Sequence, residues 1–341
     1  MAKIDGTGID GFYGDCVNVS ILNLDDRVEY SIDGGRLWTP YNVPFEICSS
    51  TTVLYRGIRS KGISKPKIVA VNIDKNPPEI LPVIEPSPNP EGWNNSEVTI
   101  SFICRDRESG IKECPSPVRL SEEESFQSVK ASAKDKVGNE GFAEVKINID
   151  RTPPAVSITG LVEGRMYFLC DRPSADFRAQ DTISGVKDAK AFTIPDDKVV
   201  GSFKYIVRAT DRAGNLVEEV RSYQIIYKFE GFGAPVSYKK PFKQGSVVPI
   251  RFKLSDGCGN RIIDAQAKFT IELVSRFVSE DPTVEIDDEP LFGDRGDLFS
   301  YDYVTGEYVY NLSTESLFSG IWKISVTLND GKTYSEMITI K

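Results

Sequence analysis

Hydrophobic and polar residues alternate in several runs of this chain. Every second residue is apolar at 98–104, 143–149 and 203–209. Successive side chains of a β-strand point to opposite faces, so a period of two predicts strands with one buried face. No window of similar length shows the 3.6-residue apolar stripe of an amphipathic helix. The pattern therefore predicts an all-β protein.

Short turn and linker sequences recur along the chain at one period. The segment 133–139, Ala-Lys-Asp-Lys-Val-Gly-Asn, returns at 209–215 as Ala-Thr-Asp-Arg-Ala-Gly-Asn. The linker 73–78, Ile-Asp-Lys-Asn-Pro-Pro, returns at 149–154 as Ile-Asp-Arg-Thr-Pro-Pro. A third marker, Ser-Gly followed by Ile or Val and then Lys, lies at 109–112 and again at 184–187. The three pairs share a period of roughly 75 residues, which is close to the length of a small seven-stranded sandwich.

The proline pairs and the end of the period predict where the modules meet. Proline cannot donate to a strand ladder and restricts the residue before it, which predicts stiff, extended linkers. From about Tyr227 the period is lost, but alternation at 248–254 and 322–328 predicts a further β unit. Pro249 is expected at a sheet edge or at a strand's start. We predict tandem immunoglobulin-like β-sandwich modules at residues 1–75, 76–152 and 153–227, followed by a C-terminal β-sandwich domain at 228–341.

Three stretches carry a family resemblance. Residues 28–35, Val-Glu-Tyr-Ser-Ile-Asp-Gly-Gly, resemble the bacterial Ig-like repeats labelled OmpL-type β domains. Residues 98–102 with 135–139 are similar to Ig-like modules of large bacterial and archaeal surface proteins. Residues 248–252, Val-Pro-Ile-Arg-Phe, resemble a C-terminal domain type named for a Pro-x-Lys-Phe motif, with Arg251 in place of lysine. The resemblance implies an extracellular or cell-surface setting but fixes no single activity.

Composition removes several functional classes. The chain of 341 residues contains no histidine, which excludes Ser-His-Asp and Cys-His nucleophile systems and histidine-ligated metals. The formal charge is −9 and no basic cluster is present, so nucleic acid is not an expected partner. No apolar stretch is long enough for a membrane helix, and the first twenty residues lack the pattern of a signal peptide. We expect a piece of a larger exported protein, or a chain without its targeting segment, that is no enzyme and holds no cofactor.

The six cysteines predict disulfides. Cys104 and Cys114 lie ten positions apart around a Ser-Gly turn, as a bridge that closes a short loop requires. Cys16 and Cys48 both fall in the first predicted module, and we expect them to pair likewise. Two alternatives stay open for the remaining pair, Cys170 and Cys258, which lie in different modules: a link between modules that fold back together, or two free buried thiols. Zinc is disfavoured because close cysteine pairs and histidines are both lacking.

The repeated Asp-x-x-Gly-Asn turns have a structural and a functional interpretation. In the structural one, the Asp135 and Asp211 carboxylates accept backbone N–H bonds within the turn while glycine takes a positive φ. In the functional one, calcium binds at the module junctions with Asp74 or Asp150 as further ligands. The structural interpretation is favoured because the complete ligand set of a known calcium loop is missing.

An acidic stretch lies in the last module, at 280–289 and Asp294, and leads into the tripeptide Arg-Gly-Asp at 295–297. Some adhesive ligands use this tripeptide, but a three-residue match is weak, and a solvated loop is the favoured interpretation. Trp38 and Trp93 are candidates for a sugar platform, although sandwich cores use aromatic residues more often.

We expect a structural stalk, spacer or adhesive array with surface proteins or glycans as partners. One alternative is the accessory polysaccharide-binding region of a secreted hydrolase. Another is an enzyme whose two facing carboxylates lie in a deep cleft.

Overall fold

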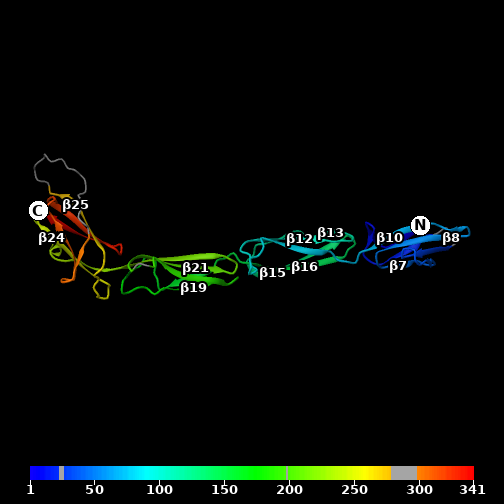
Figure 1. The fold of residues 1–341 in the computed structure, drawn as a ribbon, viewed down its shortest axis with the longest axis horizontal. Coiled ribbons are helices and arrows are strands. Elements are labelled where there is room, and N and C mark those ends of the chain that lie inside the picture. The colour runs from blue at the N-terminus through cyan, green and yellow to red at the C-terminus, as the bar shows by residue number, and fades with distance from the viewer. Residues whose placement is uncertain (23–26, 197–198, 278–297) are drawn as a thin grey trace, which may run out of the picture. The chain divides into compact units, whose positions relative to one another are not determined.

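The computed structural model describes residues 1–22, 27–196, 199–277 and 298–341 (Figure 1). The acidic stretch 280–289, Asp294 and the Arg-Gly-Asp tripeptide at 295–297 lie outside the described residues. The chain forms two compact units. The first contains residues 1–152 with the short loops 182–185 and 211–215, and the second contains 153–181, 186–210 and 216–341. The names first, second and third module and C-terminal domain are used below for the predicted ranges.

The first module is a sandwich of two sheets. One sheet has the order β1 (Ala2–Asp5), β4 (Val17–Ile21), β7 (Phe45–Ile47). The other has the order β2 (Gly8–Ile9), β3 (Phe12–Tyr13), β10 (Lys67–Ile73), β8 (Thr51–Arg59), β5 (Arg27–Ser31), β6 (Thr39–Pro40), with β9 (Gly62–Ile63) added to β8. Apolar side chains from both sheets, including Val19 and Val53, pack together between them and form the core.

The second module has two three-stranded sheets rather than the seven strands expected for its length. Their orders are β11 (Glu79–Glu85), β12 (Val98–Arg105), β14 (Val118–Leu120) and β13 (Ile111–Glu113), β15 (Glu124–Asp135), β16 (Glu140–Ile149). Its two longest strands are β15, with 12 residues, and β16, with 10 residues. Val98 and Ile100 of the first sheet pack against Val129, Ile147 and Ile149 of the second. The predicted strands at 98–104 and 143–149 are confirmed.

The third module again pairs a small sheet with a larger one. The sheets have the orders β17 (Ala155–Thr159), β19 (Asp176–Gln180) and β18 (Met166–Phe168), β22 (Leu216–Ile226), β21 (Gly201–Asp211), β20 (Val186–Ile194). The strand predicted at 203–209 is confirmed as the centre of β21. Its inward side chains, among them Phe203 and Val207, are almost completely buried.

The C-terminal domain is a further arrangement of two sheets. Their orders are β23 (Lys228–Phe232), β24 (Val247–Ser255), β27 (Glu307–Ser313), β26 (Ser300–Asp302) and β25 (Ala267–Arg276), β28 (Gly320–Leu328), β29 (Thr333–Ile340), with the short 3-10 helix η1 (Val236–Tyr238) between β23 and β24. The predicted strands at 248–254 and 322–328 are confirmed. Pro249 lies near the start of β24, before the part that β23 covers, so its missing N–H interrupts no bond to that neighbour.

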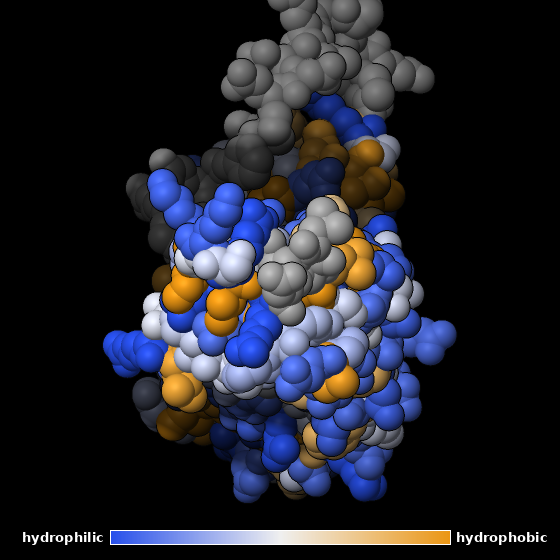
Figure 2. Space-filling model, turned by 90° about the vertical axis from the view of Figure 1, so that its right-hand side faces the viewer, coloured by the Kyte–Doolittle hydropathy of each residue, from blue (hydrophilic) through white to orange (hydrophobic). Residues whose placement is uncertain are grey.

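One face of the molecule can be followed in a space-filling view. On that face hydrophobic residues are scattered among hydrophilic ones (Figure 2). Scattered apolar residues are normal on a protein surface and do not mark a binding face.

Candidate functional site at the aspartate turns

The Asp-x-x-Gly-Asn turn between β15 and β16 closes on the carboxylate of Asp135. One oxygen of Asp135 accepts the backbone N–H groups of Gly138 at 2.6 Å and Asn139 at 2.8 Å. The other accepts the Asn139 side-chain amide at 2.7 Å. Gly138 has a φ of +104°, a conformation that other residues rarely adopt. Asp135 therefore makes all the hydrogen bonds that the structural interpretation expects. Its side chain is completely buried.

The same turn contacts the end of the preceding module. Asp74 follows β10 directly, and its backbone carbonyl accepts the Asn139 side-chain amide at 3.0 Å. The Asp74 carboxylate accepts the backbone N–H of Ser109 at 3.0 Å, from the loop that precedes β13. Asp74 is completely buried. The end of the first module is thus hydrogen-bonded to two loops of the second, all within the first unit.

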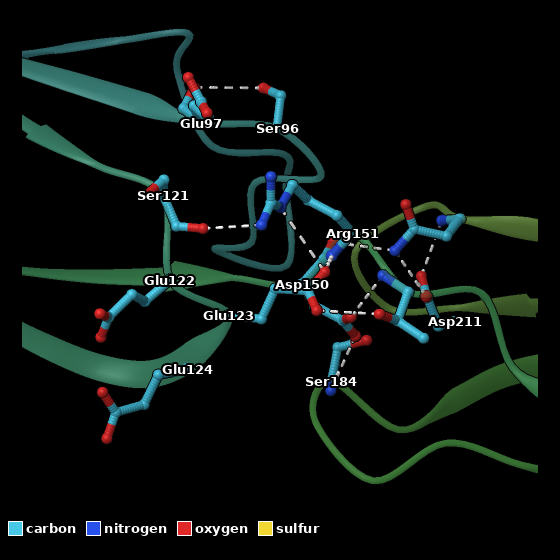
Figure 3. Close-up of polar contacts among 12 residues, drawn as sticks. Ser96, Glu97, Ser121, Glu122, Glu123, Glu124, Asp150, Arg151, Ser184 and Asp211 are labelled. Carbon is cyan, nitrogen blue, oxygen red and sulfur yellow. Dashed lines mark hydrogen bonds and ion pairs between the residues drawn. The ribbon is translucent and has the colours of Figure 1, made fainter.

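A second copy repeats these contacts around Asp150, which follows β16 (Figure 3). The Asp150 carboxylate accepts the Ser184 backbone N–H at 3.0 Å, and its carbonyl accepts the Asn215 side-chain amide at 2.8 Å. The Asp211 carboxylate closes its own turn on the backbone N–H groups of Gly214 and Asn215 at 2.7 and 2.8 Å. The sequence repeat is therefore a repeat of hydrogen bonds between the same atoms.

Acidic side chains gather at the first junction. Carboxylate oxygens of Asp74, Asp106 and Asp135 all lie within 4.8 Å of one another. Among the described residues, none of the three forms an ion pair with a basic side chain. Burial alone would raise the pKa of Asp74, but hydrogen bonds from Ser109 and neighbouring groups outweigh it and the pKa is lowered. The adjacent Asp74 carboxylate raises the pKa of Glu108.

The chemistry of this cluster fits a hard cation. Calcium prefers carboxylate and carbonyl oxygens, and three converging carboxylates supply part of such a ligand set. Asp74 and Asp135 are the expected ligands here, whereas Asp106 was not expected, because its role depends on the loop that brings it toward Asp74. Asp181 is its counterpart in the repeat, because each of the two precedes the Ser-Gly marker at the same spacing.

A third turn of the same kind lies in the C-terminal domain, where Asp256-Gly257 is a turn signal in the sequence but a third Asp-x-x-Gly-Asn turn was not expected. It has the sequence Asp-Gly-Cys-Gly-Asn at 256–260. One oxygen of Asp256 accepts the backbone N–H groups of Cys258 at 2.8 Å and Asn260 at 3.1 Å, and the other accepts the Asn260 amide at 2.7 Å. The repeat period does not point to this turn, because Asp256 follows Asp211 too closely in the sequence. The five-residue motif alone was the available signal.

All six cysteines are disulfide-bonded in the structure. Cys16 joins Cys48 with Cα atoms 4.1 Å apart, and Cys104 joins Cys114 with Cα atoms 5.9 Å apart. Of the two alternatives for the remaining pair, the structure has the link between modules: Cys170 joins Cys258, with Cα atoms 6.0 Å apart. A hydrogen bond from the Cys170 backbone N–H to the Asp256 carbonyl, 3.0 Å long, accompanies this bridge.

The candidate sugar platform is partly covered. The Arg56 guanidinium carbon lies 3.7 Å from the centre of the Trp38 ring, and the indole N–H donates to the Gly35 carbonyl. Two cavities, of about 310 and 380 Å³, lie in the first and third modules. Among the described residues, the lining of the first contains no carboxylate, and that of the second contains one, Asp196. The described linings therefore do not supply the two facing carboxylates of a glycoside hydrolase.

Comparisons with known proteins find only distant structural similarity. No family model matches the chain, and no curated protein matches it. One similar solved structure is a tetra-tandem repeat in the extending region of a large adhesion protein, with a TM-score of 0.28, 11% identity, and coverage of 100% of this chain and 98% of that chain. Another comprises extracellular cadherin domains 3–6 of protocadherin gamma B2, with a TM-score of 0.27, 13% identity, and coverage of 100% of this chain and 98% of that chain.

Immunoglobulin domains 1–5 of Sidekick-1 are also similar, with a TM-score of 0.24, 10% identity, and coverage of 100% of this chain and 80% of that chain. With TM-scores this low, the sheets described above carry the assignment. The chain is an all-β tandem array of immunoglobulin-like sandwiches. No helix in the described part of the chain is long and apolar enough to cross a membrane.

Proposed function

We propose that this chain is a non-catalytic part of an exported surface protein, in which four modules with boundaries near residues 76, 153 and 228 form a stalk, spacer or adhesive array. The observation that carries the proposal is the Asp74 junction. A flexible linker would leave two modules free to rotate, whereas here a buried carboxylate and a carbonyl at the end of one module accept hydrogen bonds from two loops of the next. Such an arrangement serves positioning rather than chemistry.

The energy of the junction supports this role. Hydrogen bonds to a charged acceptor contribute roughly 1.5 to 3 kcal/mol each, and leaving a buried partner unsatisfied costs about as much. Asp74 accepts backbone N–H groups from Ser109 and Asn76, and its carbonyl accepts a third bond. The proline pair after Asn76 adds stiffness because it fixes backbone φ angles. Together these terms favour one orientation of the two modules.

The disulfides support an oxidising location. Disulfides persist in secreted and cell-surface proteins and are rare in the cytosol. Three bridges in a chain with no free cysteine fit an extracellular setting. The resemblance to bacterial and archaeal Ig-like surface repeats points the same way.

Replacing Asp74 tests the positional role. Fluorescent labels at the exposed residues Lys61 and Glu122 report the distance between the first and second modules. We expect a narrow distance distribution for the native chain and a broad one for Asp74→Ala, because the Ser109 bond is lost. Asp33→Ala is the matched control, since Asp33 also accepts backbone N–H bonds in a turn but lies within one module. Equal widths for the native chain and Asp74→Ala would contradict the proposal.

Calcium at this junction is a second candidate function, favoured by the converging carboxylates of Asp74, Asp106 and Asp135. A cation there would offset their repulsion and strengthen the junction only when bound. A ligand at a hundred times its Kd stabilises the folded state by about 2.7 kcal/mol. We expect a chelator to lower the melting temperature of the native chain and added calcium to restore it. The melting temperature of Asp106→Asn should change far less on chelation. An unchanged melting temperature on chelation would show that the junction works without metal.

The polysaccharide-binding alternative has a separate test. Arg56 covers one face of Trp38, so a sugar would have to displace it or use Trp93. Binding on a glycan array that is lost on Trp93→Ala would support this alternative. A clean absence of binding would remove it.

A further inference from the structure

The third aspartate turn differs from the first two in how it contacts the preceding module. In the first two turns the asparagine side chain also donates to the carbonyl of Asp74 or Asp150. In the third, the Asn260 amide bonds only to Asp256 among the described contacts. Cys258, in the middle of the turn, is instead bonded to Cys170 of the third module. At this junction a covalent bond, accompanied by the hydrogen bond from the Cys170 N–H to the Asp256 carbonyl, joins the turn to the third module.

This bridge is also the most accessible of the three. Cys170 and Cys258 are both exposed, whereas each of the other bridges has one half-buried partner, Cys16 or Cys104. Thiol–disulfide exchange requires a thiolate to approach a sulfur along the S–S axis, so access governs its rate, and exposed bridges are the labile ones. The Cys170–Cys258 bridge is therefore the expected first point of reduction.

The position of the bridge in the chain gives its reduction a large mechanical effect. The two cysteines are 88 residues apart in the sequence. The closed loop contains the third-module strands β19 to β22, together with β23 and all of β24. Tension applied to the chain ends passes directly from Cys170 to Cys258 while the bridge is intact. The strands inside the loop then cannot be extended, even if the module unfolds.

We propose that the Cys170–Cys258 bridge is a site of thiol–disulfide exchange that sets the extensible length of the chain. A thiolate of a dithiol reductant attacks one sulfur, forms a mixed disulfide and releases the other cysteine as a thiolate, which takes up a proton. The second thiol of the reductant then displaces the first cysteine. Two electrons pass to the protein, and the dithiol becomes a disulfide. Reduction frees 88 residues, which extend by about 300 Å at roughly 3.3 to 3.6 Å per residue.

Single-molecule pulling on the full chain, with handles at its two ends, tests the length effect. The same molecule is pulled in oxidising buffer and again after soluble dithiol is added. We expect the released contour length to increase by a step of about 300 Å on reduction. Cys170→Ser with Cys258→Ser should release that length without reductant. The control, Cys104→Ser with Cys114→Ser, should add only about 35 Å, because its cysteines are ten residues apart.

Isotope-coded alkylation at limiting dithiol tests the order of reduction. We expect Cys170 and Cys258 to be labelled before the other four cysteines. Prior labelling of Cys104 and Cys114 or of Cys16 and Cys48, or the absence of the expected length step in the reduced native chain, would overturn the proposal. The biological use of the site rests on the proposed surface role, which protease shaving of intact cells tests separately. A chain absent from the surface would refute the stalk while leaving the pulling result intact.

Discussion

Replacing Asp135 by alanine should loosen the β15–β16 hairpin selectively. The side chain is completely buried and accepts two backbone N–H bonds and one amide bond, 2.6 to 2.8 Å long. Alanine keeps the backbone conformation accessible but removes both acceptor oxygens and so all three hydrogen bonds. The effect is therefore a loss of hydrogen bonds and not a loss of packing.

The size of the effect follows from the exposure of each donor. Gly138 is exposed, so water can replace its acceptor at little cost, whereas the half-buried Asn139 loses two bonds to a charged group. At roughly 1.5 to 3 kcal/mol per bond, with partial rescue by water, we expect about 3 kcal/mol of destabilisation. Since each 1.4 kcal/mol is about tenfold, this is roughly a 100-fold change in the opening equilibrium.

Native-state hydrogen exchange measures this opening strand by strand. Peptides covering β15 and β16 should lose about 100-fold protection in Asp135→Ala. Peptides from β25 and β28, in the other unit, serve as an internal control and should keep their protection. Asp256→Ala offers a matched variant, because it removes three hydrogen bonds of the corresponding turn in the other unit and should leave the protection of β15 and β16 unchanged.

Two outcomes would contradict this prediction. If the hydrogen-exchange protection of β15 and β16 falls less than about threefold, the hydrogen bonds to the Asp135 carboxylate stabilise the hairpin no more than hydrogen bonds to water do. An equal loss of protection in both units would mean that the variant acts through global unfolding and not through the turn.

Three more predictions concern Asp330, Gly141 and the loop closed by the Cys104–Cys114 disulfide. Burial raises the pKa of the Asp330 carboxyl above its ordinary 3.8, so the folded chain holds this proton more tightly than the unfolded chain. Its contribution to stability then falls as pH rises through that raised pKa, and Asp330→Asn should flatten the dependence of the unfolding midpoint on pH above about 4. Gly141→Ala should destabilise the second module by a few kcal/mol, because the added Cβ would overlap the Pro78 carbonyl oxygen; calorimetry checks this. Cys104→Ser with Cys114→Ser should cost roughly 3 kcal/mol in denaturant unfolding, and no change would refute the loop-entropy reasoning.

Local patterns in the sequence were sufficient for much of the fold. Alternation at 98–104, 203–209 and 322–328 predicted strands that the structure confirms. The period of two is visible in the sequence because successive side chains of a strand point alternately to its buried and its exposed face. The Asp-x-x-Gly-Asn turns could also be predicted from the sequence, since their hydrogen bonds join residues at most four apart. The number of strands in the second module could not be predicted, because it depends on how long β15 and β16 become once they pair.

The junction contacts depend on the tertiary structure. Sequence identified Asp74 and Asp135 as matched landmarks, but Asp106 and Ser109 became neighbours of Asp74 only when the second module packed against the first. The partner of Cys170 is a similar case, since its bond to Cys258 joins residues 88 apart. Local propensity has no information on such distant pairs, because the packing of whole modules decides which of them meet. Short-range patterns in the sequence therefore predict the β-strands and their turns, whereas long-range packing settles which residues of the neighbouring module those turns contact.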